Sequence, residues 1–269
     1  MPLANFSHMR YTARMTEETT YIYGKHAVAE AVSARPDIVR AVHSTKGGVD
    51  DAFAKQLAKA HIPLLELTQK KLLKMVSSDA VHQGIIAEIN PHQLTVSYEE
   101  FIAKYNVTND SAFVLLGEVQ DPHNVGAVIR SAAAFGVSGV LIPEHRQAQV
   151  NGTVIKVSAG MAFQVPLISL TNVNHVVADL KHRGFWVYGL AGDAAQSVAD
   201  EQFEKPTVLI LGNEGTGIRK KTLEHCDIPL RIPMSEKAES LNASVAAGVV
   251  LYAWSVHHPR ALNEKTNRQ

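Results

Sequence analysis

The chain of 269 residues contains a single cysteine, Cys226, which excludes an internal disulfide and is typical of a reducing compartment. It has no apolar run approaching the roughly 20 residues that a membrane span requires. No apolar segment follows the N-terminal positive charges as it would in a secretory signal. These absences predict a soluble, cytoplasmic protein with no membrane partner.

The chain also lacks net charge, because its 26 basic residues are balanced by 26 acidic ones. Affinity for nucleic acid comes largely from neutralising phosphates, so this balance gives no overall attraction. Local clustering matters more than the sum. Two basic clusters stand out, and either is equally typical of a solvated helix face: Lys70, Lys71 and Lys74, and Arg219, Lys220 and Lys221. The 13 histidines show no ligand spacing, so we expect no metal site.

The composition, 46% hydrophobic, allows a substantial core, and the apolar pattern divides the chain into segments. Residues 1–20 are polar and aperiodic, which predicts a disordered leader. Residues 21–95 predict a small α/β domain, residues 96–110 a linker containing a short helix, and residues 259–269 a flexible tail. In the small domain we expect helices over 24–34, 51–60 and 68–76 and strands over 38–43, 62–67 and 84–89.

Residues 111–258 alternate strands and helices, which implies a parallel sheet with helices on both faces. The predicted strands cover 111–118, 139–143, 165–170, 185–190, 207–211 and 228–232. The predicted helices cover 124–135, 154–163, 173–182, 218–224 and 241–254. Open α/β sheets bind ligands in the loops at the carboxyl ends of their strands.

Three such loops carry polar side chains. The first is Asp121-Pro-His-Asn-Val-Gly-Ala-Val-Ile-Arg130. Asn124 is placed to cap the following helix, and Arg130 lies nearly two turns further on. The pattern alone also fits a plain helix cap and an exposed arginine.

The second loop is Leu211-Gly-Asn-Glu-Gly-Thr-Gly217, and the third is Ile232-Pro-Met followed by Ser240-Leu-Asn-Ala-Ser244. The glycine spacing of the second loop is neither that of a dinucleotide fold nor that of a phosphate loop. A tight turn explains its glycines but not Glu214. In the third loop, Ser240 and Asn242 place hydrogen-bonding groups at the start of the last helix, where a simple cap is the alternative.

Together these motifs resemble the SpoU (TrmH-like) branch of the SPOUT RNA 2'-O-methyltransferases, in their order and in their polar residues. The segment Lys156-Val-Ser-Ala-Gly-Met-Ala-Phe-Gln-Val-Pro166 is similar to the family's stretch between the first two motifs. Tyr21-Ile-Tyr-Gly-Lys-His-Ala-Val28 is similar to the opening of the substrate-binding domain in members that methylate a guanosine of large-subunit (23S) ribosomal RNA. That domain has the fold of ribosomal protein L30e.

The resemblance implies an α/β catalytic domain whose parallel sheet contains a deep trefoil knot, S-adenosylmethionine as methyl donor, and an RNA partner. It implies a homodimer, which we expect to form through the first-motif helix and the last helix, and no DNA partner. The implied catalytic residues are Asn124, Arg130, Glu214, Ser240 and Asn242. The implied cofactor-binding residues are Leu190, Ala191, Gly212, Ile232 and Leu241.

The resemblance implies that Arg130 is the proton acceptor or polariser of the ribose hydroxyl. Because a guanidinium pKa lies above about 12, stabilising the developing alkoxide or holding a phosphate is an equally physical role. Two positions depart from the family: Phe163 stands where ribosomal members often have glutamate, and Glu236 where glycine is common.

Three alternatives to the ribosomal substrate remain open. Transfer RNA is one, a Rossmann-type oxidoreductase is another, and a non-catalytic RNA-binding protein is the third. The glycine spacing disfavours the oxidoreductase. The intact set of Asn124, Arg130, Glu214 and Asn242 disfavours the non-catalytic protein.

Overall fold

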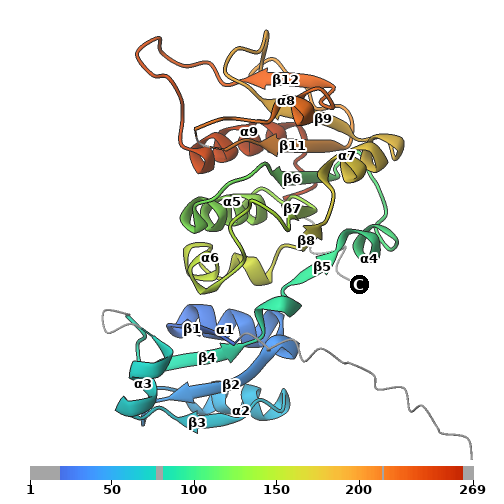
Figure 1. Ribbon diagram of the computed structural model, residues 1–269. Coiled ribbons are helices and arrows are strands. Elements are labelled where there is room, and N and C mark those ends of the chain that lie inside the picture. The colour runs from blue at the N-terminus through green and yellow to red at the C-terminus, as the bar shows by residue number, and fades with distance from the viewer. Residues whose placement is uncertain (1–18, 77–80, 214, 263–269) are drawn as a thin grey trace, which may run out of the picture.

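The computed structural model describes residues 19–76, 81–213 and 215–262, and over these residues the chain forms a four-stranded and an eight-stranded sheet. Figure 1 shows the two sheets in separate layers, with the smaller one built from the N-terminal part of the chain. Of the expected leader, residues 1–18 lie outside the described residues, as do residues 263–269 of the expected tail. We refer to residues 21–95 as the small domain.

The small sheet has the order β1-β4-β2-β3, with β2 and β3 parallel and the other pairings antiparallel. Its strands are β1 (Thr20–Tyr23), β2 (Val39–Ser44), β3 (Leu64–Glu66) and β4 (Ile85–Ile89). Its helices are α1 (Lys25–Ala34), α2 (Asp51–Lys59) and α3 (Gln69–Met75). The predicted helices and strands of this domain are all present. Strand β1 was not predicted, and it forms by pairing along its whole length with β4.

The large sheet is parallel throughout and has the order β10-β12-β9-β11-β6-β7-β8-β5. Its strands are β5 (Thr95–Ser97), β6 (Ala112–Leu116), β7 (Gly139–Pro143), β8 (Leu167–Leu170), β9 (Trp186–Leu190), β10 (Gln196–Ser197), β11 (Thr207–Leu211) and β12 (Ile228–Arg231). The predicted parallel α/β architecture is therefore confirmed. The trefoil knot stays a prediction.

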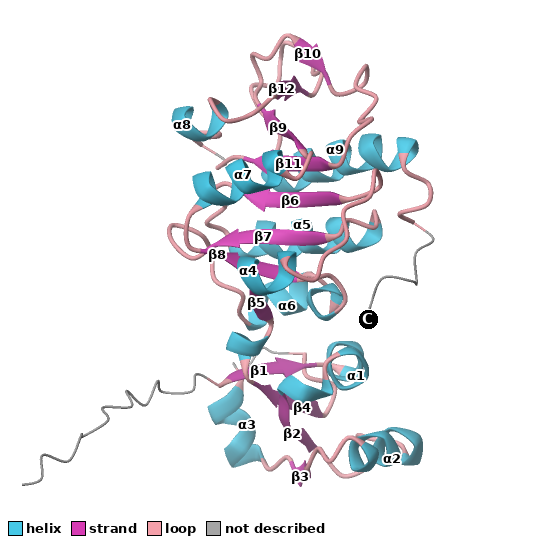
Figure 2. Ribbon diagram, turned by 90° about the vertical axis from the view of Figure 1, so that its right-hand side faces the viewer, coloured by secondary structure: helices cyan, strands magenta, loops and turns pink. Residues whose placement is uncertain are grey.

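Helices cover both faces of this sheet (Figure 2). They are α4 (Tyr98–Ile102), α5 (Pro122–Ala134), α6 (Gly152–Val157), α7 (Val173–His182), α8 (Lys220–Leu223) and α9 (Ala243–His257). Alternate residues of β6 point to opposite faces. Val114 packs in the core beneath α5, α6 and α9, whereas Phe113 packs in the core beneath α4 and α7. Burial on both faces explains why the strands are apolar without interruption.

Two segments differ from expectation. Residues 96–110, expected to be a linker with a short helix, hold that helix as α4, but they also contain most of β5, which pairs with β8. The helix predicted over 154–163 is broken: α6 ends at Val157 and a 3₁₀ turn covers Met161–Phe163. Ala159 and Gly160 between them have φ of 52° and 83°, in the left-handed region that ends helices. No helix in the described ranges has the length and apolarity to cross a membrane.

Candidate functional site

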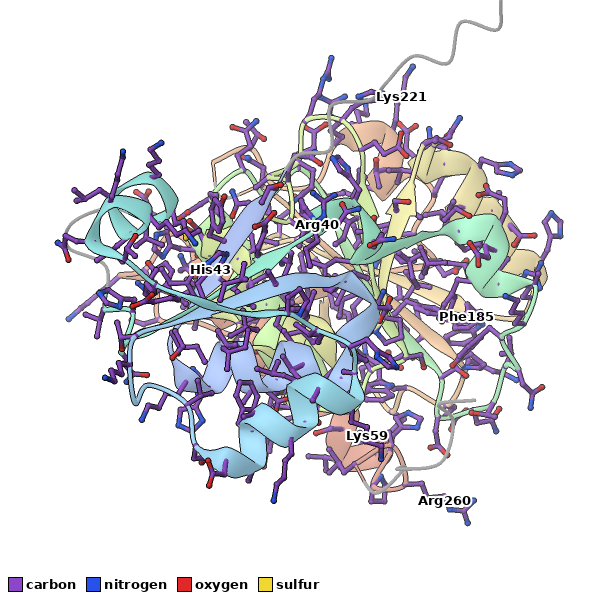
Figure 3. All side chains as sticks on the ribbon, turned by 90° about the horizontal axis from the view of Figure 1, so that it is seen from below. Arg40, His43, Lys59, Phe185, Lys221 and Arg260 are labelled. Carbon is purple, nitrogen blue, oxygen red and sulfur yellow. The ribbon has the colours of Figure 1, made fainter. Side chains whose placement is uncertain are left out.

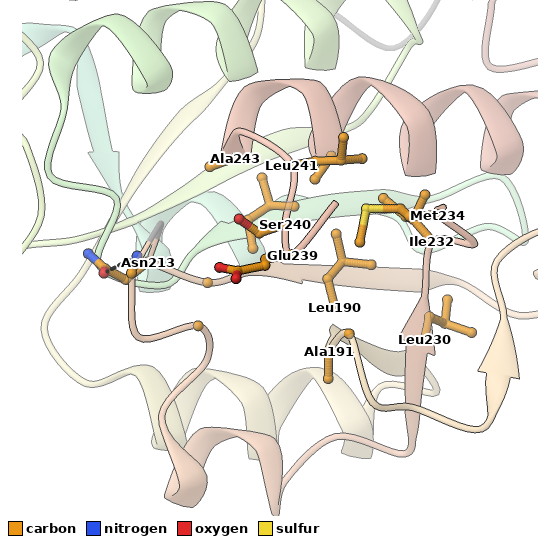
Figure 4. A pocket seen from close by; sticks show the side chains of 16 residues that line it. Leu190, Ala191, Asn213, Leu230, Ile232, Met234, Glu239, Ser240, Leu241 and Ala243 are labelled. Atoms are coloured by element: carbon orange, nitrogen blue, oxygen red, sulfur yellow. Dashed lines mark hydrogen bonds between the residues drawn. The ribbon is translucent and has the colours of Figure 1, made fainter. Parts of the chain in front are cut away.

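A cavity of about 240 Å³ opens where β9, β11 and β12 end and α9 begins (Figure 4). Since β12, β9 and β11 are neighbours in the sheet, their carboxyl ends lie side by side. Six of the ten residues predicted as site residues line this cavity: Leu190, Ala191, Gly212, Ile232, Ser240 and Leu241. They include all five residues predicted to bind a cofactor.

The cavity has an apolar and a polar side. Leu190, Ile232 and Leu241 present aliphatic side chains, whereas Glu239 and Ser240 bring oxygen atoms to the other side (Figure 4). Such a wall suits a ligand with one flat apolar part and several hydrogen-bonding groups.

The backbone of Gly217 and Ile218 lies very close to Gly212, the residue after β11. A Cβ atom there would overlap the backbone of Gly217 and Ile218. The chain folds back because Asn213 and Gly217 exchange two backbone hydrogen bonds, of 3.0 and 2.9 Å. Any larger residue at Gly212 would force this turn open, so glycine is required for a steric reason.

Asn213 organises the second-motif loop, although its role was not predicted. Its Oδ1 accepts hydrogen bonds from the backbone N–H groups of Gly215 (3.0 Å) and Thr216 (3.1 Å). Its Nδ2 donates to the carbonyl of Glu118 at 2.9 Å. The sequence indicates half of this arrangement, because an asparagine in a turn commonly bonds the backbone two residues on, which here is Gly215. The adjacent Glu214 lies outside the described residues.

Glu118 joins the first-motif loop to the second. It has a φ of 68°, an uncommon value for a residue with a side chain. Its carboxylate forms an ion pair with Arg219 Nε at 2.8 Å, while its carbonyl accepts from Asn213. The left-handed backbone at Glu118 is therefore held by contacts from both sides of the loop, as is common for strained residues at functional sites.

Asn124 and Asn242 connect the first and third motifs. The prediction that Asn124 caps α5 is wrong, because Asp121 is the cap and accepts from the N–H of His123 at 2.8 Å. Asn124 lies in the first turn of α5, is buried, and accepts a hydrogen bond from Asn242 Nδ2 at 2.9 Å. Asn242 caps α9, which the sequence left open as the alternative to a site role, since its Oδ1 accepts from the N–H groups of Ser244 and Val245. One side chain thus caps a helix and ties it to another.

Arg130 lies in the second half of α5, is exposed, and is not among the residues that line the cavity. The two departures from the family pattern also lie away from the cavity wall. Phe163 is buried in the core at the end of the 3₁₀ turn, and Glu236 is exposed in the loop between β12 and α9.

The single cysteine, Cys226, does not line the cavity. Burial raises the pKa of the Cys226 thiol to about 11, so it is protonated at neutral pH. In the described part of the chain, no group of three or more histidine, cysteine, aspartate or glutamate side chains is arranged to hold a metal ion.

Comparison with known proteins covers both sheets. Residues 111–252 match the SpoU rRNA Methylase family, and residues 21–95 match the RNA 2'-O ribose methyltransferase substrate binding family. The 23S rRNA (guanosine-2'-O-)-methyltransferase RlmB of Pseudomonas aeruginosa is 36% identical over 236 residues, which is 86% of this chain and 94% of that protein. The enzyme of the same name from Xanthomonas campestris is 38% identical over 241 residues, 88% of this chain and 96% of that protein.

Solved structures show the same fold. The SpoU methyltransferase AviRb of Streptomyces viridochromogenes, in complex with AdoMet, superposes with a TM-score of 0.75 at 22% identity, covering 90% of this chain and 91% of that one. An RNA 2'-O ribose methyltransferase superposes with a TM-score of 0.71 at 25% identity, covering 90% of each chain. With both regions matched and more than a third of the aligned residues identical to these relatives, the chain belongs to the SpoU rRNA methylase family.

Proposed function

We propose that this protein transfers a methyl group from S-adenosylmethionine to the ribose 2'-hydroxyl of a guanosine in 23S ribosomal RNA. The observation that carries the proposal is the 36–38% identity to two enzymes named for that activity, over nearly their full length. We propose that the protein acts on this RNA in the cytoplasm.

The cavity fits the proposed cofactor. The aliphatic side of Leu190, Ile232 and Leu241 suits an adenine ring, and Asn213, Glu239 and Ser240 offer partners for hydroxyl and amino groups. Gly212 leaves backbone exposed where a side chain would block the approach. When bound, S-adenosylmethionine supplies a methyl group on an electron-poor sulfur.

The chain's own residues prepare the acceptor. A ribose hydroxyl is a weak acid and a poor nucleophile until its proton is removed or its developing charge is stabilised. Arg130 stabilises that charge and grips a neighbouring phosphate with its planar fork. The Asn124–Asn242 bond holds the start of α9, and with it one side of the cavity, against the helix that carries Arg130. We assign Glu214 to orienting the arginine or the nucleotide, and Ser240 to supporting the loop.

RNA contacts are expected at two separate basic clusters. Lys70, Lys71 and Lys74 are exposed on and beside α3 in the small domain, while Arg219, Lys220 and Lys221 are exposed at α8. Figure 1 shows α3 and α8 at opposite ends of the molecule, and Figure 3 shows the Lys221 side chain projecting from the periphery. An RNA that touches both clusters must be long or folded, as ribosomal RNA is.

We further propose that two copies of the chain associate through α9. Val245, Val249, Tyr252 and Val256 are spaced by four, three and four residues, so they form one stripe on the helix. Their exposed fractions of 51, 37, 61 and 57% leave this apolar stripe open in the single chain. A second copy covering it through the same face would give a two-fold symmetric dimer.

The direct test is to incubate the purified protein with S-adenosylmethionine and 23S ribosomal RNA and to identify methylated nucleosides by mass spectrometry. We expect 2'-O-methylguanosine at one site, and the same nucleoside missing from ribosomal RNA of a strain that lacks the protein. If transfer RNA is methylated and 23S ribosomal RNA is not, transfer RNA is the substrate and the proposed ribosomal substrate is wrong. Absence of any methylated product, with RNA still bound, would indicate a non-catalytic RNA-binding protein.

A further inference from the structure

The small domain contacts the large sheet through α6 and the 3₁₀ turn that follows it. Gln164 Nε2 donates to Glu30 Oε2 on α1 at 2.6 Å, a short bond to a charged acceptor. Lys156 Nζ donates to the Tyr23 hydroxyl at 3.1 Å and lies 5.0 Å from the centroid of the same ring. Both contacts join residues more than 130 positions apart in the chain. None of the four side chains lines the cavity.

Backbone geometry brings these side chains together. The left-handed pair Ala159 and Gly160 ends α6 and turns the chain towards α1. A Cβ atom on Gly160 would lie 3.1 Å from Cβ of Glu30, and one on Gly152 would lie 3.1 Å from the carbonyl oxygen of Tyr21. The two parts of the chain therefore approach at van der Waals distance at both ends of α6.

Helix α6 is in turn packed tightly on α5. A Cβ atom on Gly126 would lie 2.7 Å from Cβ of Val157 and 2.8 Å from the carbonyl oxygen of Val154. Gly126 is two residues from Asn124, whose bond to Asn242 reaches the cavity. Contacts thus run without a gap from the small domain through α6 and α5 to the start of α9.

The contact also includes apolar packing, because buried residues of α1 and of α6 belong to one hydrophobic cluster, and the polar bonds add to it. A cleft of about 550 Å³ lies beside it, between Ala34 and Arg35 on one side and residues 162–167 on the other. Interfaces between domains allow relative motion unless they are large and hydrophobic. The hydrogen bond between the Glu30 carboxylate and Gln164 borders that cleft. It favours one orientation of the small domain relative to the large sheet.

We propose that the contacts Glu30–Gln164 and Tyr23–Lys156 are positioning contacts that fix the substrate-binding domain relative to the methyl-transfer cavity. With the span between the two RNA-contacting regions fixed, only one ribose of a bound RNA reaches the transferred methyl group. This inference rests on the proposed function, because it concerns where the methyl group is placed. It also explains Phe163: its ring is buried beside Gln164 in the docking segment and serves packing.

A charge exchange across the contact tests this. Gln164→Glu sets two carboxylates against each other, whereas Glu30→Gln alone keeps an acceptor for Gln164. The double variant Glu30→Gln/Gln164→Glu restores a donor–acceptor pair with the polarity reversed. We expect Gln164→Glu to lower kcat/KM for RNA about tenfold, with added methylation at neighbouring nucleotides. Wild-type behaviour should return in the double variant, and S-adenosylhomocysteine affinity should be unchanged in all. The matched control is Gln202→Glu, which makes the same change at an exposed glutamine between β10 and β11. It should behave as the wild type.

Hydrogen exchange supplies a readout independent of catalysis. Amides of α1 and of the turn at residues 158–164 should exchange faster in Gln164→Glu, and the double variant should reverse this. If Gln164→Glu methylates the same nucleotide at the wild-type rate with unchanged exchange, the positioning role is overturned. If wild-type protein methylates no RNA, the proposed function fails, while the exchange data still decide whether the contact docks the domain.

Discussion

The side chain of Asn242 has two roles, because it caps α9 and also bonds to a residue of α5. Variants of Asn242 can therefore separate helix capping from assembly of the site. Its Oδ1 caps α9, and its Nδ2 donates to the buried Asn124. Serine keeps the cap and loses the link to α5, since its hydroxyl is too short to span to Asn124. Alanine loses both. The pair of variants therefore separates the two contributions.

The magnitudes follow from the two interactions. Removing an N-cap costs about 1 kcal/mol, and removing one buried hydrogen bond costs about another 1 kcal/mol. We expect Asn242→Ser to lower the free energy of unfolding by about 1 kcal/mol and Asn242→Ala by about 2 kcal/mol. Both should lose most methyl transfer, because α9 and α5 are no longer tied together at the cavity.

Urea unfolding without cofactor measures the stability change, and single-turnover methylation measures the chemistry. Asn172 is the matched control, since it caps α7 through the N–H of His175 at 3.1 Å and lies away from the cavity. Asn172→Ser should be nearly neutral and Asn172→Ala should cost about 1 kcal/mol, with methylation intact. If Asn242→Ser is as stable and as active as the wild type, the link between the helices has no role in the site.

Three further predictions concern the arginine, the dimer and pH. Arg130→Ala should abolish methyl transfer and leave calorimetric affinity for S-adenosylhomocysteine unchanged, and Arg130→Lys should fail substantially because it loses the planar fork; loss of cofactor binding would instead make Arg130 structural. Tyr252→Glu should convert a dimer into a monomer by light scattering, whereas Leu73→Glu, at an apolar residue on α3 that is 64% exposed, should not; a wild-type monomer with full activity would reject the dimer. Burial alone would raise the pKa of Asp179, but hydrogen bonds from Tyr98 and Arg183 outweigh it and hold the pKa below its usual value of 3.8. The contribution of Asp179 to stability is therefore complete above that value and is lost as pH falls through the lower folded pKa, so the difference in unfolding free energy between wild type and Asp179→Asn should shrink below about pH 4.

Elements with strong local signals could be located from sequence alone. The predicted bounds of β7 (Gly139–Pro143), α7 (Val173–His182) and β11 (Thr207–Leu211) are those of the structure. Each is a regular apolar pattern with a clear stop or start, such as the cap at Asn172. In such segments local preference and burial favour the same structure.

Other elements depend on partners that the sequence does not identify. Strands β1 and β10 are short edge strands that exist because β4 and β12 offer a pairing edge. The break after α6 depends on Ala159, which adopts a left-handed φ without being glycine.

The cap of α5, by contrast, was predictable, since Pro122 favours the first helical position and so makes Asp121 the cap.

The site divides in the same way. Six of the sixteen residues that line the cavity were predicted, and five of these came from the family resemblance. The role of Asn213 was not predicted, because its partner is the carbonyl of Glu118, which lies 95 residues earlier in the chain. A side-chain bond to a distant backbone carbonyl leaves no periodicity or spacing in the sequence. Only the fold places the two loops together.

Arg130 lies outside the cavity proposed to bind the cofactor. Among the described residues, those that line the cavity lie at or after the ends of β9, β11 and β12 or at the start of α9, and Arg130 is not one of them. Arg130 is exposed on α5, where a group that arrives from outside, which in the proposed reaction is RNA, can reach it. Cofactor binding and RNA capture are then energetically separable. Variants of the cavity wall should change affinity for S-adenosylhomocysteine, whereas variants of Arg130 and of the Glu30–Gln164 contact should change only what happens once RNA is bound.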